Sequence, residues 1–221
     1  CKVSTIQKEM GAELLINISA SPFHENKISE RIEHVSLKAK QLRLPFIYCN
    51  MIGGQEELIF DGSSFAISKD GFLLSQARSF KEDLKIVNLS SNKKHMSSTI
   101  CREEEIFNAL CLGVKDYFLK TGHEKTVLGL SGGIDSALVA SIAVSALGKN
   151  NVYGISLPSK FSSSHSLNDA KQLAINLGIE YQVIKIHSII KSFETTLKPS
   201  FKNLNANIAE ENIQSLSLIH I

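Results

Sequence analysis

The stretch from residue 126 to residue 137 constrains the fold of this chain more than any other. An apolar run over residues 126–130 is followed by Ser131-Gly132-Gly133 and then by a helix-forming segment over residues 134–147. Glycine has no Cβ, so main-chain N–H groups can crowd inward at such a turn, and a helix N-terminus adds free N–H donors and a partial positive charge. The pattern therefore predicts a strand, turn and helix that bind phosphate, with Ser131 and Ser136 adding hydroxyl donors. The alternative is an ordinary glycine turn between a strand and a helix.

The segments after this turn alternate between strand and helix patterns. Further strands are expected over residues 152–157 and 181–186, and a second helix over residues 166–177. A βαβαβ order of this kind predicts a parallel, helix-covered sheet with right-handed crossovers. Ligands of such sheets bind at the carboxyl ends of the strands, where the Ser131 loop and Pro158-Ser159-Lys160 both fall. Lys160 is a candidate partner for a phosphate, and its alternative is a surface lysine.

The first part of the chain mixes strands with one amphipathic helix. Strands are expected over residues 13–18 and 46–49, a helix over residues 26–42, and a hairpin of residues 63–68 and 71–77. Residues 90–99 are polar without periodicity, and Glu103-Glu104-Glu105 then begins a helix that extends to about residue 119. We therefore expect a first domain over residues 1–89, a linker over residues 90–100 and a second domain over residues 101–221.

Composition excludes several classes of protein. The net charge of +2 over 221 residues gives no electrostatic case for a nucleic acid or an anionic membrane as partner. No apolar run reaches the roughly eighteen residues that a membrane span requires, and the N-terminus lacks the apolar segment of a signal peptide. The cysteines form no C-x-x-C pair, which argues against a zinc site and suits the reducing cytoplasm as the location: Cys1, Cys49, Cys101 and Cys111.

The loop sequence itself is specific. It lacks the Gly-Lys-Ser/Thr ending of a Walker A loop and is not G-x-G-x-x-G, but Ser131-Gly132-Gly133-Ile134-Asp135-Ser136 resembles the pyrophosphate loop of the ATP pyrophosphatases. Two further segments, residues 157–163 and Glu210-Glu211-Asn212-Ile213-Gln214, are similar to segments of glutamine-dependent NAD synthetases. The second part of the chain therefore resembles that family.

The first part resembles the carboxyl-terminal portion of a nitrilase-fold glutamine amidohydrolase. The similarity lies in residues 11–17 and 19–23, in Tyr48-Cys49-Asn50, and in residues 53–58 and 60–64. The presence of both halves in this order narrows the resemblance to one family, glutamine-dependent NAD synthetase. The resemblance covers nearly the whole chain. The implied fold class is α/β, with the C-terminal part of a nitrilase-like αββα sandwich followed by a Rossmann-like parallel-sheet ATP-pyrophosphatase domain.

The resemblance implies a carbon–nitrogen ligase. ATP would adenylate the nicotinate carboxylate of deamido-NAD, and ammonia from glutamine would displace AMP to give NAD. The implied ATP-binding residues are Gly129, Leu130, Ser131, Gly132, Gly133, Ile134, Asp135 and Ser136. Asp135 is also the expected ligand of Mg²⁺, a hard cation that prefers carboxylate oxygen, and its alternative is a helix-start residue favoured by the dipole.

The other substrates have fewer candidate residues. Asn212 is the implied contact of deamido-NAD, with a solvated helix position as its alternative. Ser21 and Lys27 match positions that bind glutamine in the family, and an ammonium near the substrate carboxylate makes electrostatic sense. Their alternatives are a turn residue before Pro22 and a solvated lysine. His24 and His165 are interpreted as loop residues that have no catalytic role.

The chain also departs from the family pattern. The amidohydrolase uses a Glu–Lys–Cys triad, whose Glu and Lys are not found here. Cys1-Lys2-Val3 does not match the Cys-Glu-Asp context of the nucleophile, so Cys1 is interpreted as a stray terminal cysteine and no catalytic residue is assigned. Residues 215–221 replace an expected Arg-rich helix, and the chain does not begin with Met.

These departures indicate an internal fragment that by itself hydrolyses no glutamine. The resemblance implies that the parent enzyme is a homo-oligomer. The alternatives are another ATP-pyrophosphatase amidotransferase, similar to GMP synthetase or to a tRNA-thiolating enzyme, and an inactive nucleotide-binding fragment.

Overall fold

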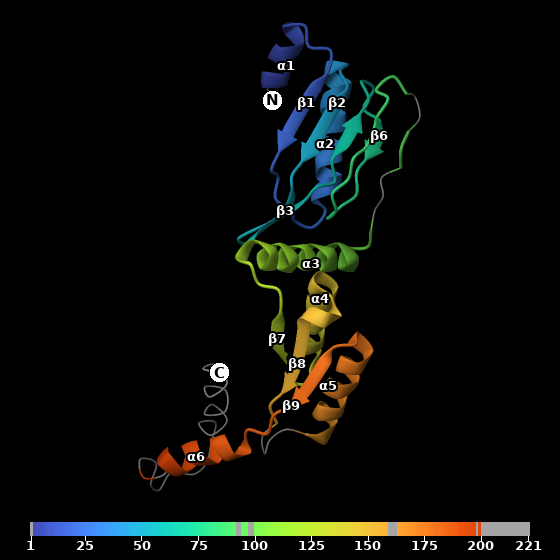
Figure 1. Ribbon diagram of the computed structural model, residues 1–221. Helices are drawn as coiled ribbons and strands as arrows, with labels where there is room; N and C mark the ends of the chain where they lie inside the picture. The colour runs from blue at the N-terminus through green and yellow to red at the C-terminus, as the bar shows by residue number, and fades with distance from the viewer. Residues whose placement is uncertain (1, 92–93, 97–99, 159–162, 198, 200–221) are drawn as a thin grey trace. The chain divides into compact units, whose positions relative to one another are not determined.

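The chain folds into two compact units, Cys1–Glu124 and Lys125–Ile221 (Figure 1). The computed structural model describes residues 2–91, 94–96, 100–158, 163–197 and 199. Within these residues, no helix has both the length and the apolar character needed to cross a membrane. The expected Asn212, Lys160 and Cys1, and the segment 215–221, lie outside the described residues.

The first unit is built on a mixed four-stranded sheet of order β1-β2-β5-β6. Strands β1 and β2 pair in parallel, and the other two neighbours pair antiparallel. The expected strands, hairpin and amphipathic helix are confirmed within a few residues, whereas α1 and the β3–β4 hairpin were not expected. The elements are α1 (Lys2–Glu9), β1 (Leu15–Ser19), α2 (Lys27–Leu42), β2 (Phe46–Asn50), β3 (Ile52–Gln55), β4 (Leu58–Asp61), β5 (Phe65–Ile67), β6 (Leu73–Gln76) and α3 (Arg102–Thr121).

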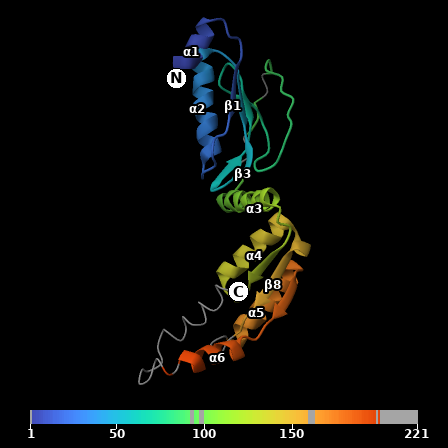
Figure 2. The same ribbon diagram turned by 60° about the vertical axis from the view of Figure 1, so that its left-hand side comes forward.

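Helix α2 covers one face of this sheet (Figure 2). Because side chains alternate along a strand, Phe46 and Tyr48 of β2 point into the core, where Tyr48 stacks on Phe65 at a ring distance of 5.0 Å. The helix contributes Ala39, which is fully buried. Ile16 and Ile18 of β1 are exposed, so the core of the unit lies on the α2 side of the sheet.

Helix α3 packs on the β3–β4 hairpin. The Gly54 N–H donates to Asp116 Oδ2 at 2.8 Å, and Lys120 Nζ donates to the Gly54 carbonyl. Glycines allow the hairpin and the helix to lie this close together, because a Cβ on Gly54 would lie 3.3 Å from the Cα of Gly113. The contacts of α3 therefore place it in the first compact unit. The domain boundary expected at residues 90–100 stays a prediction.

The second unit contains a parallel sheet of order β7-β8-β9. Helices α4 and α5 both pack on this sheet and on each other, and they lie on the same side of it (Figure 2). The parallel arrangement and the bounds of α4 confirm the predictions. The elements are β7 (Thr126–Gly129), α4 (Ile134–Leu147), a 3₁₀ turn (Lys149–Asn151), β8 (Val152–Ser156), α5 (Ser164–Leu177), β9 (Glu180–Val183) and α6 (His187–Leu197).

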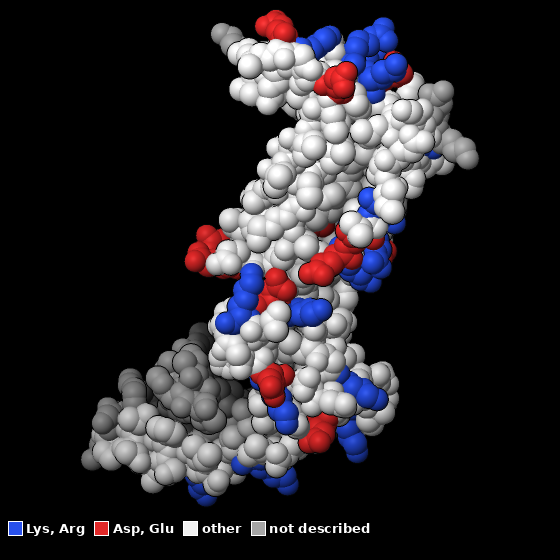
Figure 3. Space-filling view, turned by 45° about the horizontal axis from the view of Figure 1, so that its top comes forward, with Lys and Arg blue, Asp and Glu red and all other residues white. Residues whose placement is uncertain are grey.

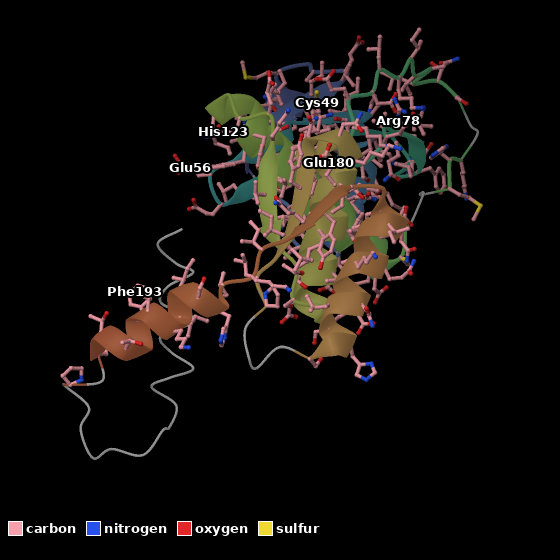
Figure 4. The ribbon with its side chains drawn as sticks, turned by 60° about the horizontal axis from the view of Figure 1, so that its bottom comes forward. Cys49, Glu56, Arg78, His123, Glu180 and Phe193 are labelled. Carbon is pink, nitrogen blue, oxygen red and sulfur yellow. The ribbon has the colours of Figure 1, made fainter. Side chains whose placement is uncertain are left out.

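Three details differ from the predictions for this unit. The last strand begins at Glu180 (Figure 4) and ends at Val183 rather than residue 186. Helix α5 begins two residues earlier than expected, because Ser163 caps it by accepting a hydrogen bond from the Ser166 N–H at 3.1 Å. Helix α6 was not expected, and His165 lies in α5 rather than in a loop.

Candidate functional site

The glycine loop leaves the sheet at the carboxyl edge that the sequence predicts. Leu130 N–H donates to the Ile155 carbonyl at 2.8 Å, and Ser156 Oγ donates to the Leu130 carbonyl at 2.6 Å. Leu130 itself is 3% exposed and packs in the core. Its side chain anchors the loop to β8 and its N–H donates to β8, so Leu130 has no free donor for a ligand in this conformation.

Gly132 is the most constrained residue of the loop. Its φ of +80° lies in the left-handed region that favours glycine. A Cβ at this position would lie 2.7 Å from the Cα of Ser166 and 2.8 Å from its carbonyl carbon. The loop is therefore pressed against the first turn of α5, and the N-terminal ends of α4 and α5 meet at this edge of the sheet.

The main-chain donors of the loop are only partly used. Ser131 N–H donates to Ser136 Oγ at 3.3 Å, and Gly133 N–H donates to Ser131 Oγ at 3.2 Å. Both distances are at the long end for hydrogen bonds of this kind. Among the described residues, the N–H groups of Gly132, Ile134 and Asp135 have no acceptor.

Helix α4 also lacks a side-chain cap at its N-terminus. Its N-cap residue is Gly133, which has no side chain to accept from the first turn, whereas Ser163 caps α5. Uncapped N–H groups at a helix start carry partial positive charge and need an acceptor. An anion of the size of a phosphate group supplies such acceptors, and the Ser131 and Ser136 hydroxyls, 3.1 Å apart, can turn toward it.

Asp135 is the carboxylate within the segment Ser131-Gly132-Gly133-Ile134-Asp135-Ser136. It is exposed in the first turn of α4 and forms no ion pair with the described residues. Within those residues, no group of three or more His, Cys, Asp or Glu side chains could hold a metal ion. Mg²⁺ is often held by one or two carboxylates together with substrate phosphates, so Asp135 fits Mg²⁺ that arrives with a nucleotide.

The two candidate glutamine-binding residues flank one short loop in the first unit. Ser21 is half-buried after β1, and its N–H donates to Asn50 Oδ1 at 2.9 Å. Lys27 is the first residue of α2, with its Nζ 3.3 Å from Glu30 Oε2. His24 between them is exposed. The structure thus brings Ser21 and Lys27 to the same end of the sheet and helix.

A buried ion pair beneath this loop was missed by the sequence analysis. Arg31 Nη1 lies 2.7 Å from Asp61 Oδ1, and the two side chains are 5% and 3% exposed. Arg31 Nε and Nη2 donate to Ser21 Oγ and to the Ser21 carbonyl at 3.2 and 2.8 Å. The available signal was a charged residue among the apolar positions of helix 26–42, directly before Ile32.

Helix α3 contacts the same loop from its outer side. Arg102 Nε lies 2.6 Å from Glu25 Oε1, and its hydrogen bond lowers the pKa of Glu25 against the opposing effect of partial burial. Burial, and then the charge of Asp61, raise the pKa of Glu105. Glu105 therefore lies close to the loop of residues 21–27, where it accepts a main-chain hydrogen bond from Asn26, whereas Glu103 and Glu104 are exposed.

Comparison with known proteins places the chain in a family. Residues 106–217, which include the glycine loop, match the family model for NAD synthase. The chain belongs to the NAD synthase family. It is 46% identical over 213 residues to the glutamine-dependent NAD(+) synthetase of Synechocystis sp. and 38% identical over 242 residues to that of Thermotoga maritima.

The matches cover most of this chain but only part of each relative. They include 94% and 93% of the chain, and 38% and 42% of the two relatives. A solved glutamine-dependent NAD⁺ synthetase from Acinetobacter baumannii, in complex with ADP, matches 96% of the chain and 42% of its own length, with 35% identity and a TM-score of 0.87. The match extends over both compact units. The two units therefore follow each other along the chain in the same order as in that structure.

Proposed function

We propose that this chain is the central part of a glutamine-dependent NAD synthetase, in which the second unit binds ATP and the first unit binds glutamine. The observation that carries the proposal is the uncapped start of α4, where N–H groups without acceptors follow a glycine turn at the carboxyl edge of a parallel sheet. The family match and the ADP complex of a relative at 35% identity support ATP as the ligand. The match to NAD synthase favours this function over a GMP synthetase or tRNA-thiolating enzyme.

The residues of the loop have a direct part in the proposed reaction. ATP adenylates the nicotinate carboxylate of deamido-NAD and releases pyrophosphate, and ammonia then displaces AMP. Main-chain N–H groups of Gly132, Ile134 and Asp135 would hold the phosphate oxygens with fixed dipoles that need no reorganisation as charge shifts to the leaving group. Bound Mg²⁺ supplies further neutralisation of that charge, and Asp135 would hold it beside the phosphates.

The first unit would supply the glutamine-binding residues of a nitrilase-like amidohydrolase. The Ser21 hydroxyl would donate a hydrogen bond to the substrate, and the Lys27 ammonium would pair with the substrate carboxylate. The relatives extend well beyond the matched region, since the chain spans 38–42% of their length. For the isolated polypeptide we therefore propose nucleotide binding without NAD formation. The cysteine pattern supports a cytoplasmic location.

The proposal is tested by placing this sequence in a full-length enzyme. In the Synechocystis relative, the segment that aligns with this chain is replaced by this sequence, and NAD formation is measured with glutamine and with ammonia. We expect activity with both nitrogen sources. The Ser136→Ala variant of this chimera should raise KM for ATP, because one hydroxyl donor to phosphate is lost. Ser141→Ala is the matched control, since among the described residues the Ser141 hydroxyl contacts only the Ala137 carbonyl of its own helix, and it should leave KM unchanged.

One result would contradict the proposal. A folded chimera that still hydrolyses glutamine, but forms no NAD from ammonia and does not bind ATP, would show that the second unit is not the synthase site.

A further inference from the structure

The ion pair of Arg31 and Asp61 is the most deeply buried charged group among the described residues. Arg31 Nη1 contacts both carboxylate oxygens of Asp61, at 2.7 and 2.8 Å. Removing two charges from water carries a penalty that the pair itself often fails to recover, so a buried ion pair is weak evidence for a purely stabilising role. The other N–H donors of Arg31 indicate a second role, which is to hold the loop that begins at Ser21 in place.

Those remaining donors all reach the loop that begins at Ser21. Arg31 Nε donates to Ser21 Oγ at 3.2 Å, and Nη2 donates to the carbonyls of Ser21 and Pro22 at 2.8 and 3.1 Å. Asn50 completes the set, since it accepts from Ser21 N–H at 2.9 Å and donates to the Ser21 carbonyl and to Asp61 Oδ1. The N–H, carbonyl and hydroxyl of Ser21 are therefore all held by side chains of α2 and β2.

This arrangement turns the Ser21 hydroxyl proton away from Arg31. A hydroxyl has one hydrogen to donate and can accept through its oxygen. Arg31 Nε can only donate, so Ser21 Oγ is the acceptor in that contact, and its proton has no acceptor among the described residues. The positive guanidinium also polarises the hydroxyl and strengthens it as a donor. Since Ser21 is half-buried, the proton is available to a ligand with an oxygen acceptor.

We propose that Arg31 is a positioning residue for glutamine, which acts through Ser21 by holding its hydroxyl as a donor to a carboxylate or amide oxygen of the substrate. The inference rests on the proposed function, in which Ser21 and Lys27 bind glutamine. Lys27 precedes Arg31 by one helical turn, so both cations lie on the same side of α2. In this arrangement the Lys27 ammonium pairs with the substrate carboxylate, and Arg31 holds the Ser21 hydroxyl in the orientation that donates to the substrate.

The test uses the full-length chimera and compares Arg31→Lys with the wild-type sequence. Lysine keeps the charge opposite Asp61 but lacks the planar fork that contacts Asp61 and Ser21 together. We expect KM for glutamine to rise about tenfold or more, with kcat for ammonia-dependent NAD formation unchanged. The ammonia reaction reports the integrity of the fold, because a general loss of folding lowers both activities. Arg43→Lys is the matched control, since Arg43 forms an exposed ion pair with Asp70 at 3.2 Å, and it should change neither.

A double-mutant cycle separates positioning from an independent effect. Ser21→Ala should also raise KM for glutamine, and adding Arg31→Lys should raise it little further, because both changes remove the same oriented hydroxyl. If the two effects multiply, or if Arg31→Lys leaves KM unchanged, the positioning role is wrong. If Ser21→Ala and Lys27→Ala both leave KM unchanged, the glutamine assignment itself fails and the inference fails with it. Asn50→Ser loosens Ser21 without changing charge, and it provides the same KM readout if Arg31→Lys does not fold.

Discussion

Gly132→Val should abolish ATP binding by this chain and destabilise the second unit by at least about 3 kcal/mol, through backbone strain and overpacking together. A β-branched side chain is poorly tolerated at φ +80°. Its Cβ would also meet the main chain of Ser166 at 2.7 Å. Because backbone cannot move aside as a side chain does, either α5 or the glycine loop must shift. The measurements are urea unfolding followed by circular dichroism and calorimetric titration with ATP.

Gly129→Val is the matched control for this prediction. Gly129 lies in β7 without a positive φ, and a Cβ there would have no heavy atom within 4 Å. Valine also suits a strand, so stability should change by less than about 0.5 kcal/mol, which makes Gly129→Val a control for the loss of stability alone. A Gly132→Val protein with the stability and ATP affinity of the parent would show that the loop is not packed as described.

Arg31→Ala should lower the free energy of unfolding of the first unit by about 3–5 kcal/mol, because it leaves the Asp61 carboxylate buried without its partner. Asp61 is 3% exposed, and Asn50 Nδ2 at 3.3 Å is its remaining side-chain donor. Urea unfolding monitored by tyrosine fluorescence measures the change, since the chain has four tyrosines and no tryptophan.

The control for this prediction is an ion pair that is exposed to solvent. Arg43→Ala breaks the exposed pair with Asp70 and should have little effect, as surface ion pairs generally do. Replacing both members, with Arg31→Met and Asp61→Leu, should be less damaging than Arg31→Ala alone, because no unpaired charge stays buried. If Arg31→Ala and Arg43→Ala lower the free energy of unfolding equally, the Arg31–Asp61 pair is not buried as described.

The alternation of short apolar runs with helical spacing was enough to predict the parallel sheet of the second unit. The start of α4 followed from Ser131-Gly132-Gly133 before it. The last strand was predicted too long, because Ile184 and Ile186 continue the apolar run. Ile186 is indeed buried at 3% exposure, but it precedes α6 and is not in β9. Burial alone therefore does not determine whether an apolar residue is in a strand.

The candidate site was predictable where its residues are neighbours in sequence. The proposed role of the turn glycines and serines follows from local chemistry, whereas the contact of Gly132 with Ser166 depends on how α5 returns to the sheet. The pairing of Arg31 with Asp61 joins residues 30 positions apart and required the fold to be known. On the face shown in Figure 3, basic and acidic side chains of the described residues are intermixed.

The most direct test of the ATP site is a titration of the ¹⁵N-labelled chain with ATP and Mg²⁺, followed by the backbone amide signals. The free N–H groups of Gly132, Ile134 and Asp135 are predicted to shift most, together with Gly133, as they begin to donate to phosphate oxygens. Inorganic pyrophosphate should shift the same signals, and adenosine should not. If ATP binds while these amides stay unmoved, the nucleotide lies elsewhere and the proposed phosphate site is wrong.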